Sequence, residues 1–315
     1  MQAGTIQERH TSPRTGVSAM PCDRATSRRD FLRKALAGAA AGFAAGERPL
    51  AAMATGAPSA PKAHSRVSVA RDAYLRTPGV VRTGMPIEET GPVDQERLAA
   101  LLDRVIEGLY PNADPASAWS RIAHPGEIVA IKVNTLGGKG LSSSVALVEA
   151  ICERLQEAGV RAESIVVFDR DTAELERAGF QIRTGGGGVQ CFGSDRAGFE
   201  DDLAEYGSVG SRLSRILTRR SNALISVPVL KDHDGAGVSM ALKNMFGVIH
   251  NPNKFHPDGC NPYVADVNML PEIRSRLRLT ILDATSACYE GGPAFKPEFT
   301  WRPNSLMASG YLAAM

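Results

Sequence analysis

Hydrophobic residues recur along the first half of the chain in two alternating patterns, one typical of helices and one typical of buried strands. Apolar positions from residue 93 to residue 109 follow helical spacing and predict an amphipathic helix, and residues 145–158 repeat that pattern. Between and after these helices, residues 127–133 (EIVAIKV) and 164–168 (SIVVF) are short β-branched runs. Runs of this length and composition predict strands that are buried on both faces.

The second half of the chain continues the alternation. We expect a basic helix at 211–220, a strand at 223–230, helices at 238–249 and 264–274, and a strand at 277–282. Strands that alternate with helices predict an α/β fold with a mostly parallel sheet and helices on both of its faces.

Polar side chains follow the strands at the points where each strand is expected to end. Strand by strand they are Lys132 with Asn134, Asp169, Lys231 with His233, and Asp283. In parallel sheets ligands bind outside the carboxyl ends of the strands, so we expect these side chains to line one cleft. The next helix brings further polar groups, because Lys243 and Asn244 lie there among Met and Leu. Charged and amide groups beside apolar runs are costly to bury unless they serve a ligand or pair with one another.

The lysines of this edge suit an anion. Lys132, Lys231 and Lys243 together bring three positive charges, which fit a small carboxylate or phosphate ligand. The alternative is that Lys231 and Lys243 form structural ion pairs with the carboxylates of Asp232, Asp169 or Asp283.

The same side chains divide into catalytic and ligand-binding candidates. A desolvated lysine has a lowered pKa and can act as base or nucleophile, and a histidine titrates near neutrality. The catalytic candidates are therefore His233, Lys231 and Lys132. Amides both donate and accept hydrogen bonds, which suits the orienting of a ligand. The ligand-binding candidates are Asn134, Lys243 and Asn244.

A mixed nitrogen and oxygen metal site is an open alternative. Imidazole and carboxylate ligands suit zinc, iron, nickel or manganese. The candidate ligands are His233, His256, Asp169, Asp266 and Asp283. Their spacing is irregular and no HExxH motif is present, so a hydrogen-bonded structural role for His233 stays open as well.

The N-terminal residues have the pattern of an export signal. Residues 27–34 (SRRDFLRK) match the twin-arginine pattern, and an Ala/Gly-rich segment that is too short to span a bilayer follows. We therefore expect residues 1–54 to be a twin-arginine signal peptide, 55–92 a linker and irregular arm, and 93–315 an α/β domain. The expected partner is the twin-arginine translocase, and the expected location is the periplasm or another site outside the cytoplasmic membrane. No stable membrane span is expected.

Composition and charge narrow the classes of partner and cofactor. The chain is 43% hydrophobic and 22% charged with a net charge of +2, and no basic stripe is interleaved with aromatic residues, which argues against nucleic-acid binding. The domain cysteines form no CxxC motif, which argues against a cysteine-ligated iron–sulfur cluster. They are Cys152, Cys191, Cys260 and Cys288. One disulfide among the last three stays open.

Several segments of the domain carry a family resemblance. They are IVAIKVN (128–134), VFD (167–169), ISVPVLKDH (225–233), ALKNMFG (241–247), His256, LDA (282–284) and GGP (291–293). On these residues the chain resembles the family called domain of unknown function 362, for which LKxH and ALKNxFG are the specific pieces. The resemblance implies frequent twin-arginine export and no established reaction. Family members usually continue beyond the segment NSLMAS (304–309) into a closing helix, so we expect this chain to be truncated relative to the family pattern.

These observations lead to one main interpretation and two alternatives. We expect an exported protein whose Lys/His/Asp/Asn cleft takes a small anionic ligand, with a divalent metal or redox cofactor left open. The first alternative is a non-catalytic periplasmic protein that binds a ligand or a metal. The second is a truncated chain that folds poorly.

Overall fold

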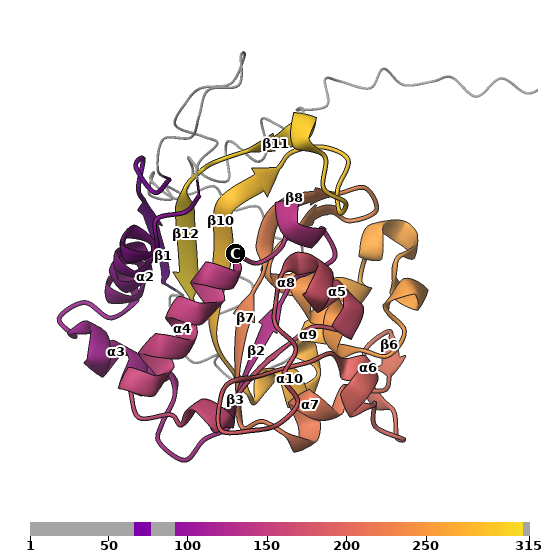
Figure 1. Ribbon diagram of the computed structural model, residues 1–315. Coiled ribbons are helices and arrows are strands. Elements are labelled where there is room, and N and C mark those ends of the chain that lie inside the picture. Colours follow the sequence, from indigo (N-terminus) through magenta and orange to yellow (C-terminus); the bar gives the residue numbers. More distant parts are fainter. Residues whose placement is uncertain (1–65, 77–91, 311–315) are drawn as a thin grey trace, which may run out of the picture.

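A computed structural model describes residues 66–76 and 92–310 of the 315-residue chain (Figure 1). The strands are β1 (Val67–Arg71), β2 (Val129–Val133), β3 (Ile165–Phe168), β4 (Gln190–Cys191), β5 (Ala204–Tyr206), β6 (Val209–Ser211), β7 (Ala223–Val227), β8 (Val229–His233), β9 (Gly237–Ser239), β10 (Leu277–Cys288), β11 (Thr300–Trp301) and β12 (Ser305–Ser309). The α-helices are α2 (Gln95–Leu109), α3 (Pro115–Ile122), α4 (Val145–Glu157), α5 (Thr172–Ala178), α6 (Ser194–Ala197), α7 (Arg215–Arg219), α8 (Ala241–Asn244), α9 (Tyr263–Met269) and α10 (Pro271–Arg274).

A central sheet with the order β1-β12-β10-β7-β2-β3-β4 organises the molecule. The pairs β10–β7, β7–β2, β2–β3 and β3–β4 are parallel, whereas β12 runs antiparallel to both β10 and β1. Beyond this path, β8 leaves β7 at Pro228, pairs with β10 and forms a hairpin with β9. The predicted α/β class with a mostly parallel sheet is confirmed.

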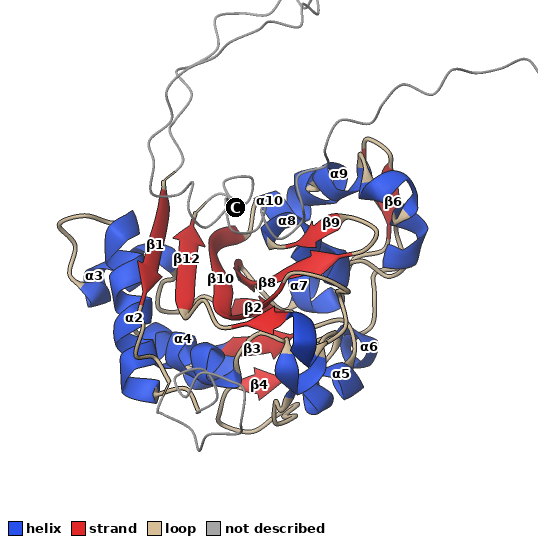
Figure 2. Cartoon of the chain, turned by 90° about the horizontal axis from the view of Figure 1, so that it is seen from above, coloured by secondary structure: helices blue, strands red, loops and turns tan. Residues whose placement is uncertain are grey.

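Helices cover both faces of this sheet (Figure 2). On one face α2, α3 and α4 pack against alternate strand residues such as Val129, Ile131 and Ile225. On the other face α7, α8, α9 and α10 pack against residues of the opposite parity, including Ala130 and Leu224. Side chains alternate across a strand, so each strand supplies both cores, which explains why the strand segments are continuously apolar.

Several elements lie where the hydrophobic pattern places them. The helix expected at 93–109 is α2, which Asp94 caps by accepting from the Arg97 backbone N–H and which buries the apolar stripe from Leu98 to Ile106. The helix expected at 145–158 is α4, and the first two expected strands are β2 and β3.

The segment 238–249, expected as one helix, has a different structure. The chain forms β9, then the single turn α8, and then a 3₁₀ turn over Met245–Val248. Gly237 has a φ of +77°, which suits the hairpin turn rather than a helix entrance. Residues 237–239 pair with β8 and therefore cannot form the first turn of the expected helix. Helical periodicity alone does not reveal that strand pairing competes with helix formation in this segment.

Other element boundaries shift at prolines and at strand pairings. Pro271 divides the helix expected at 264–274 into α9 and α10, because it cannot donate a backbone hydrogen bond. The helix expected at 211–220 shortens to α7. Ser211, where the expected helix begins, is the last residue of β6. β10 continues six residues past the expected end at 282, because β8 and β11 pair with its extension.

Part of the segment expected to be an irregular arm is a strand. Residues 67–71 form β1, which pairs antiparallel with β12 over five residue pairs. This pairing depends on a strand more than 200 residues away in the chain, so local sequence does not reveal it. The remainder of the expected linker up to residue 65, residues 77–91 and the whole expected signal peptide lie outside the described residues.

Two further observations concern cysteines and membranes. Cys152, Cys191, Cys260 and Cys288 are all free and buried, so the described residues contain no disulfide. Among the helices of residues 66–76 and 92–310, none combines the length and hydropathy that a membrane span requires.

Candidate functional site

A cleft of about 330 Å³ opens at the carboxyl ends of β2, β3 and β8. Residues of α5 and α8 also line it. Eight of the predicted site residues line it: Lys132, Asn134, Asp169, Lys231, His233, Lys243, Asn244 and His256. The carboxyl edge of the sheet thus brings together side chains from segments up to 124 residues apart in the sequence.

Two predicted metal ligands lie elsewhere. Asp266 on α9 accepts hydrogen bonds from the backbone N–H and hydroxyl of Ser208, at 2.8 and 2.6 Å. Asp283 is buried within β10, where it accepts from the backbone N–H of Ser144 at 2.7 Å and from Thr285. Burial raises the pKa of this carboxyl above its ordinary value. Asp283 was expected at a strand end, and the extension of β10 places it inside the strand instead.

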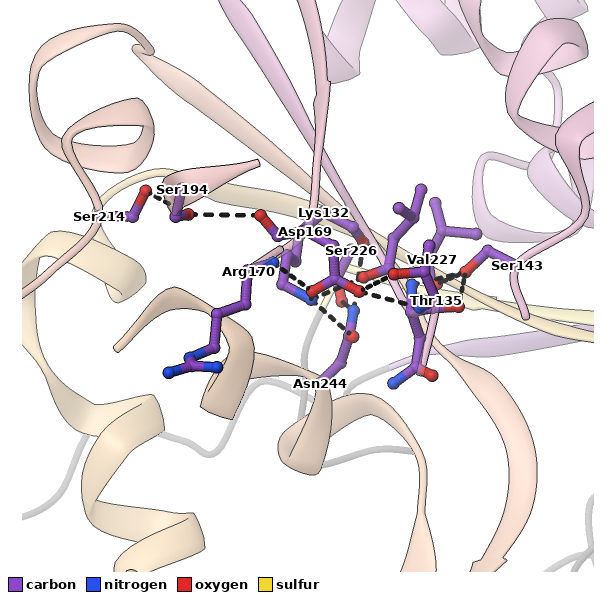
Figure 3. A network of polar contacts seen from close by, with 12 residues as sticks. Lys132, Thr135, Ser143, Asp169, Arg170, Ser194, Ser214, Ser226, Val227 and Asn244 are labelled. Carbon is purple, nitrogen blue, oxygen red and sulfur yellow. Dashed lines mark hydrogen bonds and ion pairs between the residues drawn. The ribbon is translucent and has the colours of Figure 1, made fainter. Parts of the chain in front are cut away.

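Lys132 is neutralised inside the cleft wall (Figure 3). Its ammonium lies 2.7 Å from Oδ1 of Asp169, and it donates to the carbonyl of Val133 at 2.6 Å and to Oδ1 of Asn244 at 3.2 Å. The amide of Asn244 donates in turn to the carbonyl of Lys132 and to the Ser226 hydroxyl. An ammonium has three donors, and all three are in use. Lys132 and Asn244 are therefore structural partners of Asp169, and neither has a free polar atom for a ligand.

Asp169 joins the ends of β2 and β3. Its Oδ2 accepts from the backbone N–H and the hydroxyl of Thr135, both at 2.8 Å, and its Oδ1 accepts from the Arg170 N–H at 2.7 Å (Figure 3). Gly247 lies directly against this pair, since a Cβ there would come within 2.6 Å of the Lys132 ammonium. The glycine of the ALKNMFG segment is therefore required by close packing against the ion pair.

Lys231 is buried without such compensation. Its ammonium donates to Oδ1 of Asn134 at 2.7 Å, and within the described residues no carboxylate lies in ion-pair contact with it. Burial lowers the pKa of Lys231 to about 8, although the charge of Asp169 opposes that shift. Lys231 and Lys132 are therefore not equivalent, because only Lys132 has its charge balanced locally.

Lys243 and His256 form a hydrogen-bonded pair. The Lys243 ammonium lies 3.0 Å from Nε2 of His256 and 3.9 Å from the centre of the Phe246 ring. Nδ1 of His256 lies 2.9 Å from the carbonyl oxygen of Pro252, which can only accept, so Nδ1 carries the proton and Nε2 offers a lone pair. Burial lowers the pKa of Lys243 to about 8, and burial together with Lys243 lowers the pKa of His256.

His233 is held as a neutral hydrogen-bond donor. Its Nδ1 accepts from the backbone N–H groups of Gly235 and Ala236, both at 3.1 Å, which leaves the proton on Nε2. Its ring stacks on that of His256, with the centroids 5.6 Å apart. Burial and the nearby Lys243 lower the pKa of His233 to about 4, so the imidazole is uncharged at neutral pH.

The donor set does not fit the metal site considered from the sequence. Nδ1 of His233 and Nε2 of His256 are both occupied, and Asp169 is held by Lys132. Across the described residues, no group of three or more His, Cys, Asp or Glu side chains is arranged to hold a metal ion.

Residues 129–315 match the family described as Domain of unknown function (DUF362). This match spans more than half of the chain and contains every residue of the cleft. The chain belongs to the DUF362 family. A search of curated proteins finds no match to it.

A crystal structure of a protein from Thermotoga maritima aligns with 65% of this chain and 54% of that chain, at 12% identity and a TM-score of 0.39. The chain therefore spans about half the length of that solved structure. A TM-score this low gives no information about the cleft of this DUF362 chain.

The cleft of this DUF362 chain also contains two charged residues that sequence reasoning missed, Arg170 and Glu174. Glu174 lies in the first turn of α5. Asp171 caps this helix, because its side chain accepts a hydrogen bond from the backbone N–H of Glu174 at 3.0 Å. Burial, together with the charges of Asp169 and Asp171, raises the pKa of Glu174. The sequence DTAE at 171–174 has the spacing of a helix N-terminus, so the sequence carried a signal for this helix and its glutamate.

A second depression of about 510 Å³ lies beside α4 and β4. Its described lining contains Cys152 and Cys191 but no lysine or histidine. Burial raises the pKa of both thiols to about 12, so they are protonated and unreactive at neutral pH. Among the described residues, this depression therefore lacks the lysine and histidine side chains that line the cleft.

Proposed function

We propose that the cleft binds a small anion, a carboxylate or a phosphate, through Lys231 and Lys243. The observation that carries this proposal is that these two lysines line one cleft and have no carboxylate in contact within the described residues. A buried ammonium without a counter-ion is costly, and an anionic ligand would supply the missing charge.

The charge balance of the cleft supports this proposal. The charged residues of its lining are Lys132, Asp169, Arg170, Glu174, Lys231 and Lys243. Lys132 and Asp169 cancel one another at 2.7 Å, and the rest leave an excess of positive charge. His233 adds a neutral donor at Nε2, and its lowered pKa of about 4 keeps it from adding a further charge. Such a donor can orient an anion without increasing the charge repulsion among the lysines.

Anion affinity will fall as the pH rises through about 8. Both lysines have pKa values of about 8 in the free protein, and a bound anion raises them, so binding takes up protons above that pH. Between pH 7 and pH 9 the protonated fraction of each lysine falls about tenfold, and the affinity falls by about that factor for each lysine involved. Isothermal titration calorimetry with propionate and with inorganic phosphate, repeated across this range, measures the effect. An affinity that is constant from pH 7 to pH 9, or no binding of either anion, contradicts the proposal.

We propose further that the protein is exported by the twin-arginine route. The support is the segment SRRDFLRK at 27–34, which lies outside the described residues. Replacing Arg28 and Arg29 together by lysine should abolish export, because the translocase recognises the arginine pair. Fractionation of cells that express the full chain measures this, with Arg48→Lys as the matched control outside the motif. Equal export of both variants would exclude this route.

A further inference from the structure

The geometry points to Lys243 as a nucleophilic amine that forms a reversible imine with the carbonyl carbon of a 2-oxo acid, with His256 as its base. This inference rests on the proposed anion site and adds the chemical class of its ligand. The carboxylate of a 2-oxo acid meets the positive charge of the cleft, and the adjacent ketone meets the amine of Lys243.

The contacts of Lys243 are those of an activated nucleophile. The amine lies 3.0 Å from the lone pair of His256 Nε2, and the Pro252 carbonyl fixes the histidine ring through Nδ1 at 2.9 Å. An amine, a base within hydrogen-bond reach and a third group that orients the base form the usual arrangement of nucleophilic catalysis. Lys243 is also partly exposed, unlike Lys231, so a carbonyl carbon can approach it.

Other cleft residues suit the remaining atoms of such a ligand. Lys231 stands in the same cleft as a second cation, which can hold the carboxylate while Lys243 reacts. His233 stacks on His256 and carries a proton on Nε2, so a neutral donor lies beside the base. A neutral imidazole donor can polarise a carbonyl oxygen without placing a further charge in the site.

The reaction balances without an oxidant, a reductant or a metal. The ammonium of Lys243 gives one proton to Nε2 of His256, and the nitrogen lone pair attacks the carbonyl carbon. The attacking nitrogen passes one proton to the carbonyl oxygen, which gives the carbinolamine. The imidazolium of His256 then returns its proton to the carbinolamine hydroxyl, which leaves as water. A protonated carbon–nitrogen double bond forms between the ligand and Lys243, and His256 is neutral again.

Reductive trapping tests the inference. The purified chain is incubated with pyruvate or 2-oxoglutarate and cyanoborohydride, and the modified peptides are located by mass spectrometry. We expect a reduced adduct on Lys243 that is absent from Lys243→Arg, and a trapping rate at least tenfold lower in His256→Asn, which keeps a hydrogen-bonding side chain but cannot take the proton. Lys254→Arg is the matched control, because Lys254 is exposed and lies outside the cleft lining. This control should trap as the wild type does.

Propionate separates the inference from the proposed function, because it has a carboxylate but no ketone. Propionate binding without any pyruvate or 2-oxoglutarate adduct overturns the imine and leaves the anion site standing. Failure of propionate, phosphate and both 2-oxo acids to bind overturns both. An adduct on Lys231 or Lys254 in place of Lys243 also overturns the assignment. Thermal melting of Lys243→Arg shows whether that variant is folded. His256→Asn tests the inference independently, because it keeps the amine of Lys243 and removes only the base.

Discussion

Replacement of Asp169 by alanine will destabilise the protein by about 3–5 kcal/mol, the range for removing one partner of a buried ion pair. The substitution leaves the Lys132 ammonium, which is 1% exposed, without its counter-ion. It also leaves the Thr135 backbone N–H and hydroxyl without their acceptor. The melting temperature should fall by about 6–20 °C for a domain of this size. Thermal unfolding followed by circular dichroism measures the change.

Two further variants show whether the ion pair is the cause. Asp171→Ala removes only the cap of α5, so we expect a loss of about 1 kcal/mol. The double variant Lys132→Met with Asp169→Asn removes the buried charge and keeps an acceptor for Thr135, so it should recover a large part of the lost stability. Equal losses for Asp169→Ala and Asp171→Ala, or no recovery in the double variant, would show that the ion pair does not hold the edge of the sheet together.

Much of the fold could be predicted because local patterns determine it. The stripe from Leu98 to Ile106 specifies the buried face of α2, and the apolar runs of β2 and β3 match strands buried on both sides. β1 was missed because it pairs with the distant strand β12, and β8–β9 was missed because β8 joins the sheet by pairing with the extension of β10. Pairing of this kind depends on tertiary structure rather than on local propensity.

The candidate site could be predicted in composition but not in its internal pairing. The carboxyl-edge rule correctly brings Lys132, Asp169, Lys231 and His233 to one cleft. Whether a given lysine meets a carboxylate or an amide depends on differences of a few ångströms, as Lys132 on Asp169 and Lys231 on Asn134 illustrate. The same limit applies to Asp283, whose position changed when β10 proved longer than its apolar run.

Replacement of Lys231 by methionine will weaken anion binding by at least about tenfold without lowering stability. A charge-assisted hydrogen bond contributes about 1.5–3 kcal/mol, which corresponds to an affinity change of about ten- to hundredfold. Stability should stay equal or increase, because the substitution removes a buried ammonium that has no carboxylate in contact among the described residues and keeps much of its volume. This pattern is opposite to that of Asp169→Ala, where a balanced pair is broken.

The most direct test of the anion site is calorimetric titration of propionate and phosphate into the wild type, Lys231→Met and the exposed-site control Lys254→Met at pH 7, with a melting curve for each. We predict equal affinities for the wild type and Lys254→Met, an affinity at least about tenfold weaker for Lys231→Met, and an unchanged or higher melting temperature for Lys231→Met. Equal affinities in all three proteins would contradict the account, and so would a loss of binding by Lys231→Met that is accompanied by a lower melting temperature.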